Sequence, residues 1–102
     1  MDEFITSSTG NVYQDLGVED AASMQIKADI VRRISAVMKE KNLTQQNVAE
    51  LTGIPQGRIS RILNGHFRGV SEYKLLECLS KLGNNIEIRV IPASRPGQIV
   101  FA

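Results

Sequence analysis

Residues 43–65 read L-T-Q-Q-N-V-A-E-L-T-G-I-P-Q-G-R-I-S-R-I-L-N-G, and this stretch decides the fold. Thr44 is a good N-cap for a short helix, because its hydroxyl accepts a hydrogen bond from a backbone amide of the first turn. Gly53 ends that helix, since glycine adopts a positive φ at little cost. Pro55 is well placed to open the next helix, and Asn64-Gly65 stops it. The stretch therefore predicts two short helices joined by a tight turn, the helix-turn-helix arrangement.

Further helices are predicted on both sides of this motif. Apolar residues between Asp20 and Lys41 recur at three- and four-residue steps, so we expect one long helix over 20–41, stopped by Asn42. Ser71 caps an expected fourth helix, whose leucine stripe ends at Gly83. In the short helix after Thr44, the residues expected to face the core are Val48, Ala49 and Leu51.

The hydrophobic period changes after the fourth expected helix. Ile86, Ile88 and Val90 alternate with charged residues, which predicts a strand over 86–91. An unpaired strand exposes a row of backbone donors and acceptors. We therefore expect it to pair with the same strand of a second copy and form a two-fold homodimer. An internal hairpin with residues 98–101 is the weaker alternative.

The expected fold class is mainly α, a four- to five-helix domain with one C-terminal β-strand used for dimerisation. Its parts are an acidic, weakly structured arm (1–19), the helix-turn-helix domain (20–83), the dimerisation strand (84–92) and a flexible tail (93–102). The length of 102 residues suits one domain. Hydrophobic residues at 42% and charged residues at 23% are close to the globular norm, so the chain can bury a core.

The composition also excludes several classes of protein. No stretch approaches the ~20 apolar residues of a membrane span, and the acidic start Met1-Asp2-Glu3-Phe4 does not resemble a secretory signal. Cys78 is the single cysteine, so neither an intramolecular disulfide nor a cysteine-based zinc site is expected. With one histidine, no nucleophile motif and no phosphate-binding glycine loop, we expect no enzyme, no metal and no cofactor. A reduced, cytoplasmic setting fits best.

Charge is divided unevenly along the chain. Residues 1–31 hold six acidic residues and one lysine, which gives −5, whereas residues 32–68 hold seven basic and two acidic residues, which gives +5. Residues 69–102 hold four basic and three acidic residues and complete the net charge of +1. The basic middle suits nucleic acid and the acidic start a different, basic partner, although solvated helix faces would give the same totals.

The motif resembles the Cro/repressor-type helix-turn-helix family, often called XRE. The resemblance is carried by Thr44-Gln45, Val48-Ala49, Gly53-Ile54, Ile59-Ser60 and Asn64-Gly65. The leader 8–17 and the final strand 86–91 resemble a bacterial subgroup that includes HigA-type antitoxins. This implies a repressor that binds an inverted repeat in double-stranded operator DNA and neutralises a RelE-like ribonuclease toxin. A stand-alone regulator without a toxin, or an interaction module that no longer binds DNA, are the alternatives.

The resemblance also implies which residues contact DNA. Gln45 would grip a phosphate, while Gln56, Gly57 and Arg58 occupy the positions that read bases, and Arg61 points the same way one turn later. Gly57 departs from many relatives and makes no side-chain contact, so a close approach of the backbone to DNA would explain it. The full set of expected DNA-binding residues is Thr44, Gln45, Gln56, Gly57, Arg58, Ser60, Arg61 and Asn64.

Two apolar residues of the acidic arm are candidates for the toxin contact. Tyr13 and Leu16 stand among acidic residues, and binding energy often concentrates in a few apolar anchors. The alternative is that both residues pack onto their own domain.

Overall fold

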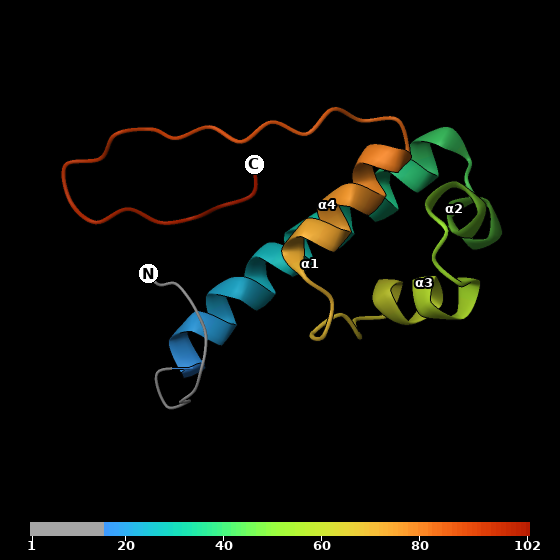
Figure 1. The fold of residues 1–102 in the computed structure, drawn as a ribbon, viewed down its shortest axis with the longest axis horizontal. Helices are drawn as coiled ribbons and strands as arrows, with labels where there is room; N and C mark the ends of the chain where they lie inside the picture. Colours follow the sequence, from blue (N-terminus) through green and yellow to red (C-terminus); the bar gives the residue numbers. More distant parts are fainter. Residues whose placement is uncertain (1–15) are drawn as a thin grey trace.

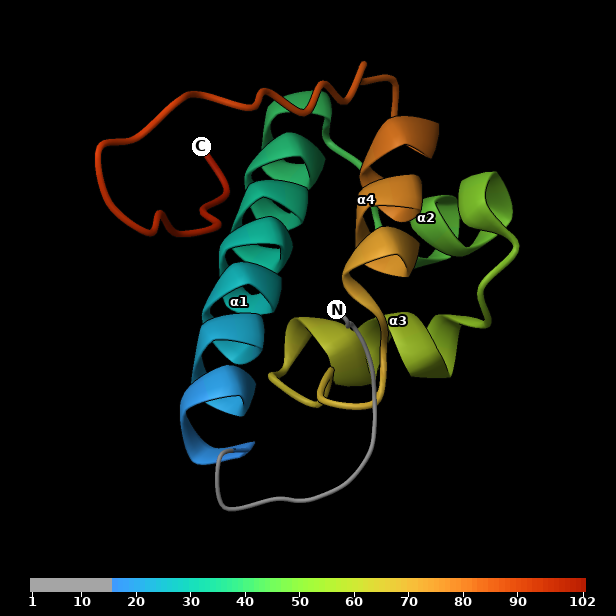
Figure 2. The same cartoon turned by 60° about the vertical axis from the view of Figure 1, so that its left-hand side comes forward.

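The computed structural model describes the backbone of residues 16–102 and the side chains of residues 20–102. Its helices in this range are α1 (Leu16–Lys41), α2 (Gln45–Thr52), α3 (Gln56–Leu63) and α4 (Glu72–Lys81). The two longest, α1 and α4, lie side by side and run in the same direction, and α2 and α3 pack together beside α4 (Figure 1, Figure 2). The expected mainly helical architecture is confirmed.

The two ends of α1 compare differently with expectation. Asn42 adopts a left-handed conformation with φ 55° and ends the helix, as the sequence indicated. The helix begins at Leu16, however, and not at Asp20. Gly17 lies inside its first turn. The helix tolerates it because one glycine lowers helix stability by only about 1 kcal/mol. The last residues of the arm expected over 1–19 are therefore helical.

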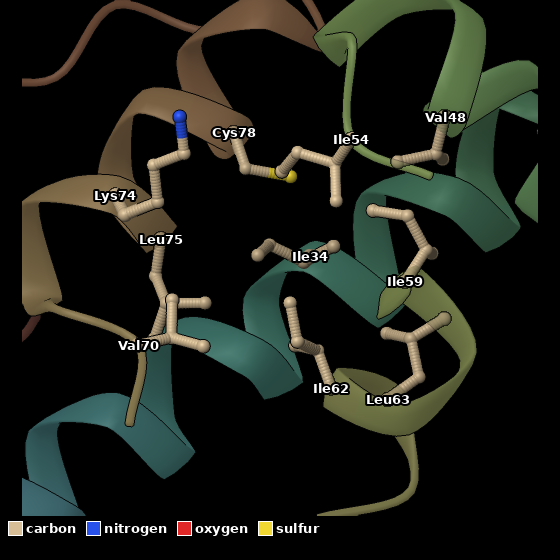
Figure 3. Close-up of a pocket in the computed structure, with 10 residues that line it drawn as sticks. All are labelled: Ile34, Val48, Ile54, Ile59, Ile62, Leu63, Val70, Lys74, Leu75 and Cys78. Carbon is tan, nitrogen blue, oxygen red and sulfur yellow. The ribbon is translucent and has the colours of Figure 1, made fainter. Parts of the chain in front are cut away.

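The core forms where α1, α3 and α4 meet. Figure 3 shows Ile34 of α1 pointing between Ile59 and Ile62 of α3 on one side and Leu75 of α4 on the other. All four side chains are buried, and Leu75 is only 1% exposed. Burying such a side chain contributes about 1.5–3 kcal/mol. This apolar contact fixes the orientation of α3 relative to the two long helices.

One prediction about α2 is wrong. Leu51, expected to face the core, is 51% exposed, whereas Thr52 is buried. Residues 48 and 52 share one helix face because they lie four apart, and Val48 is fully buried. The Thr52 hydroxyl donates to the Val48 carbonyl at 2.7 Å and accepts from the Ile54 amide at 3.2 Å. Its polar atom is therefore satisfied inside the core.

The chain beyond α4 carries no regular structure. It runs away from the helices, turns and comes back towards α1 (Figure 1). Within the part of the chain that the structure describes, residues 85–102 make no backbone hydrogen bond. The strand predicted over 86–91 is thus not confirmed, nor is a hairpin with residues 98–101, because no described segment of backbone is hydrogen-bonded to it. Phe101, placed in the expected flexible tail, is half-buried against the core.

Candidate nucleic-acid interface

The start of α2 has the expected cap and an additional contact. The Thr44 hydroxyl accepts from the Asn47 amide at 3.0 Å, and the Asn47 side-chain oxygen accepts from the Thr44 amide at 2.9 Å. This reciprocal pair is a capping box, and the sequence reasoning missed its second half. The signal was the spacing of Thr44 and Asn47, with asparagine in place of the usual glutamate. The first turn of α2 holds no acidic residue, so its positive end stays available to an anion.

The turn between α2 and α3 takes the conformation that its residues indicate. Gly53 has φ 79°, and its amide donates to the Ala49 carbonyl at 2.8 Å. Pro55 occupies the cap position just before α3, and its carbonyl accepts from the Arg58 and Ile59 amides at 3.0 Å each. Three residues, Gly53, Ile54 and Pro55, separate the two helices, and the left-handed conformation of Gly53 turns the chain between them. The helix-turn-helix motif is therefore formed.

Helix α3 has one buried and one exposed face. Ile59 and Ile62 are buried at 3% and 5% exposure, and they tie the helix to the core. The candidates on the other face are exposed, except for Ser60, which is half-buried: Gln56, Gly57, Arg58, Arg61 and Asn64. A helix in the major groove needs such a surface of exposed hydrogen-bonding groups.

The two arginines of α3 are the strongest candidates to contact DNA. Arg58 and Arg61 lie three residues apart, so they share one face. Among the described residues, no acidic side chain forms an ion pair with either of them. Both guanidinium groups can therefore reach a base edge or a phosphate without first giving up a described partner.

The other expected DNA contacts are placed less uniformly. Thr44 is exposed and Gln45 is half-buried at the start of α2. The Asn64 side-chain amide donates to the Ser60 carbonyl at 2.9 Å, so in this structure it terminates α3. A Cβ built on Gly57 meets no atom within 4 Å, so nothing in the fold itself requires glycine there.

The described residues expected to pair two copies of the chain differ in their exposure. Ile86 is half-buried against the core, whereas Ile88 and Val90 are 83% and 93% exposed. Tyr13 lies outside the described residues, and Leu16 is described only as the first residue of α1.

No helix in the described range has the length and apolar character to cross a membrane. Within that range, no group of acidic, histidine or cysteine side chains is arranged to hold a metal ion.

Comparison with known proteins agrees with this geometry. A family model described as a helix-turn-helix domain matches residues 12–91, which include all four helices. No curated protein and no solved structure matches the chain significantly. The match extends over most of the sequence and contains both the capped α2 and the exposed face of α3. The chain therefore belongs to this family of helix-turn-helix domains.

Proposed function

We propose that the protein is a sequence-specific DNA-binding transcriptional repressor of the Cro/repressor type, which acts in the cytoplasm by occupying an operator rather than by catalysis. One observation carries the proposal: α3 is fixed to the core by Ile59 and Ile62 and presents Arg58 and Arg61 outward. A rigid helix with an exposed polar face fits the major groove, and arginine pairs bidentately with guanine.

The roles of the individual residues follow from their positions. Thr44 and Gln45 stand at the positive end of α2, where they would contact a phosphate and set the register. Gln56, Arg58 and Arg61 would read base edges, with Ser60 and Asn64 beside them. The absence of a side chain at Gly57 would let the first turn of α3 approach the groove closely.

Binding sites selected from a random double-stranded DNA library would test the proposal. We expect one enriched motif. Arg58→Ala or Arg61→Ala should weaken binding to this motif. Each should also lower the discrimination between bases at one position of the motif by about 1–3 kcal/mol. The charge-matched control is Arg33→Ala. Arg33 is an exposed cation of α1, and it lines a hollow together with Phe101. Unchanged binding by the double variant of Arg58 and Arg61 would overturn the proposal.

We propose further that the repressor is a homodimer that reads an inverted repeat. The segment after α4 exposes Ile88 and Val90, and a hollow beside α4 is lined by Tyr73, Leu76 and Ile86. Pairing two copies through residues 86–91 would cover this apolar surface and satisfy the backbone. A chain that ends at Gly83 should sediment as a monomer, and a dimeric truncated chain would place the interface elsewhere.

A second candidate function is that of an antitoxin, favoured by the opposed charges of −5 in residues 1–31 and +5 in residues 32–68. An acidic segment would not assist DNA binding but would attract a basic, RelE-like ribonuclease, with Tyr13 and Leu16 as anchors. Removing residues 1–18 should then abolish rescue of growth from the co-expressed neighbouring gene product, with DNA binding intact. Retained rescue would contradict the toxin contact. A locus without such a gene would favour a stand-alone regulator.

A further inference from the structure

The first half of α1 holds the loop between α3 and α4, and the first residue of α4, through three side chains on one helix face. Asp20 forms an ion pair with Arg68. The Ser23 hydroxyl donates to the Glu72 carboxylate at 2.6 Å, and the Lys27 ammonium donates to the Arg68 carbonyl at 2.7 Å. The three α1 residues are spaced by three and four positions, so they point the same way. These contacts connect α1 to the segment that directly follows the proposed recognition helix.

The backbone at Arg68 is fixed while its side chain remains on the surface. Lys27, which is 8% exposed, holds the carbonyl of Arg68. Phe67 and Val70 on either side are buried, and the Val70 amide donates to the Phe67 carbonyl at 3.0 Å. The Arg68 side chain is nevertheless 68% exposed. A cation is therefore held at a defined point of the protein surface.

The loop that carries this cation begins at the end of α3. The His66 amide donates to the Arg61 carbonyl at 2.8 Å, so the loop folds back on the last turn of the helix. In Figure 2 the loop after α3 lies beside the first half of α1. If α3 occupies the major groove, the sugar-phosphate backbone that borders the groove runs past this loop. Arg68 is the next arginine or lysine after Arg61 in the sequence, and it stands on the loop that such a phosphate would pass.

The ion pair with Asp20 occupies that cation. The Asp20 side chain is 43% exposed, and surface pairs of this kind are weak, so the pair is readily exchanged for another anion. We propose that the Asp20 carboxylate competes with a DNA phosphate for the Arg68 guanidinium, so that the first turns of α1 restrain the affinity of the protein for DNA. This inference depends on the proposed DNA-binding function and adds a restraining residue to it.

The test is a double-mutant cycle with Asp20→Asn and Arg68→Ala, measured as Kd on the selected DNA by fluorescence anisotropy. Asp20→Asn should tighten binding about 1.5- to 5-fold, the range expected for an exposed ion pair. Arg68→Ala should weaken binding and reduce the salt slope by about 0.9, the loss of one phosphate contact. In the Arg68→Ala background, Asp20→Asn should have no further effect. Ser23→Ala is the control, because it removes a contact between α1 and α4 without changing charge.

Each result decides the matter. Equal tightening by Asp20→Asn with and without Arg68 would show general charge repulsion and overturn the proposal. Weaker binding by Asp20→Asn would mean that Asp20 orients Arg68, which also overturns it, provided that circular dichroism shows α1 intact. Unchanged binding by Arg68→Ala, together with loss of binding by Arg58→Ala, would overturn this inference and leave the DNA-binding function standing. Failure of the wild-type chain to select any DNA would instead defeat the proposed function.

Discussion

Replacing Gly57 with alanine separates what the fold requires from what DNA binding requires. A Cβ at this position meets no atom within 4 Å, and Gly57 is not among the glycines with a positive φ. Alanine therefore fits without strain and favours the helix. Glycine costs a helix interior about 0.5–1 kcal/mol relative to alanine, and we expect about 0.5 kcal/mol because Gly57 lies in the first turn of α3. The Tm should rise by about 2–4 °C.

The same methyl group should weaken DNA binding. If the first turn of α3 lies against the bases, the added methyl forces the helix outward and costs about 1 kcal/mol or more in base contacts, about a five-fold higher Kd. Fluorescence anisotropy on the selected DNA measures this, with differential scanning calorimetry for the Tm. Ser35→Ala on the exposed surface of α1 is the control, since it raises helix propensity away from α3. Unchanged DNA affinity of the Gly57 variant would refute the close approach, and a lower Tm would refute the argument from open space.

Three further predictions concern the stability of the helical domain. Thr44→Ala should lower the free energy of unfolding by about 1 kcal/mol in urea titrations, because it removes the cap of α2. Leu75→Ala should cost about 2–5 kcal/mol in the same assay, since it empties a site that is 1% exposed. Burial raises the pKa of the Cys78 thiol, opposed by Lys81 and Lys74, so the folded state favours the neutral thiol. The contribution of this protonated thiol to the free energy of unfolding should be complete below about pH 8.5 and should decrease at higher pH. An equal pH dependence of stability in Cys78→Ala would contradict this.

The local signals at the two ends of α2 predicted its bounds correctly, because each depends on one residue and its immediate neighbours. The hydroxyl of Thr44 caps α2, and the left-handed Gly53 ends it, as the residue types indicated. Leu51 was assigned wrongly because periodicity over an eight-residue helix does not separate adjacent positions at the edge of the buried face. Thr52 took the inward place because its hydroxyl has two backbone partners there, which hydrophobicity alone does not reveal.

Contacts between distant segments were beyond the reach of the sequence. Lys27 is buried and holds a carbonyl 41 positions along the chain, a contact that no local pattern indicates. The alternation over 86–91 predicts a strand that the structure does not confirm, because a strand also requires a neighbouring backbone. The exposed face of α3 was predictable, because helical spacing places Ile59 on the buried face and the polar residues on the opposite face. Which of its side chains touch DNA remains a prediction.

The segment after Gly83 has a consequence for the lifetime of the protein. Proteases cleave chains that can be drawn out in an extended form, and this segment offers such a substrate without any prior unfolding. Arg89 is exposed within it and is followed by Val90, whereas the bond after Arg95 leads to Pro96 and resists trypsin. A cut after Arg89 should therefore release the helical domain long before trypsin digests the helices. If residues 86–91 pair with a second copy, the cut after Arg89 becomes slow. The turnover of the chain would then depend on its own concentration, with dilute copies removed first.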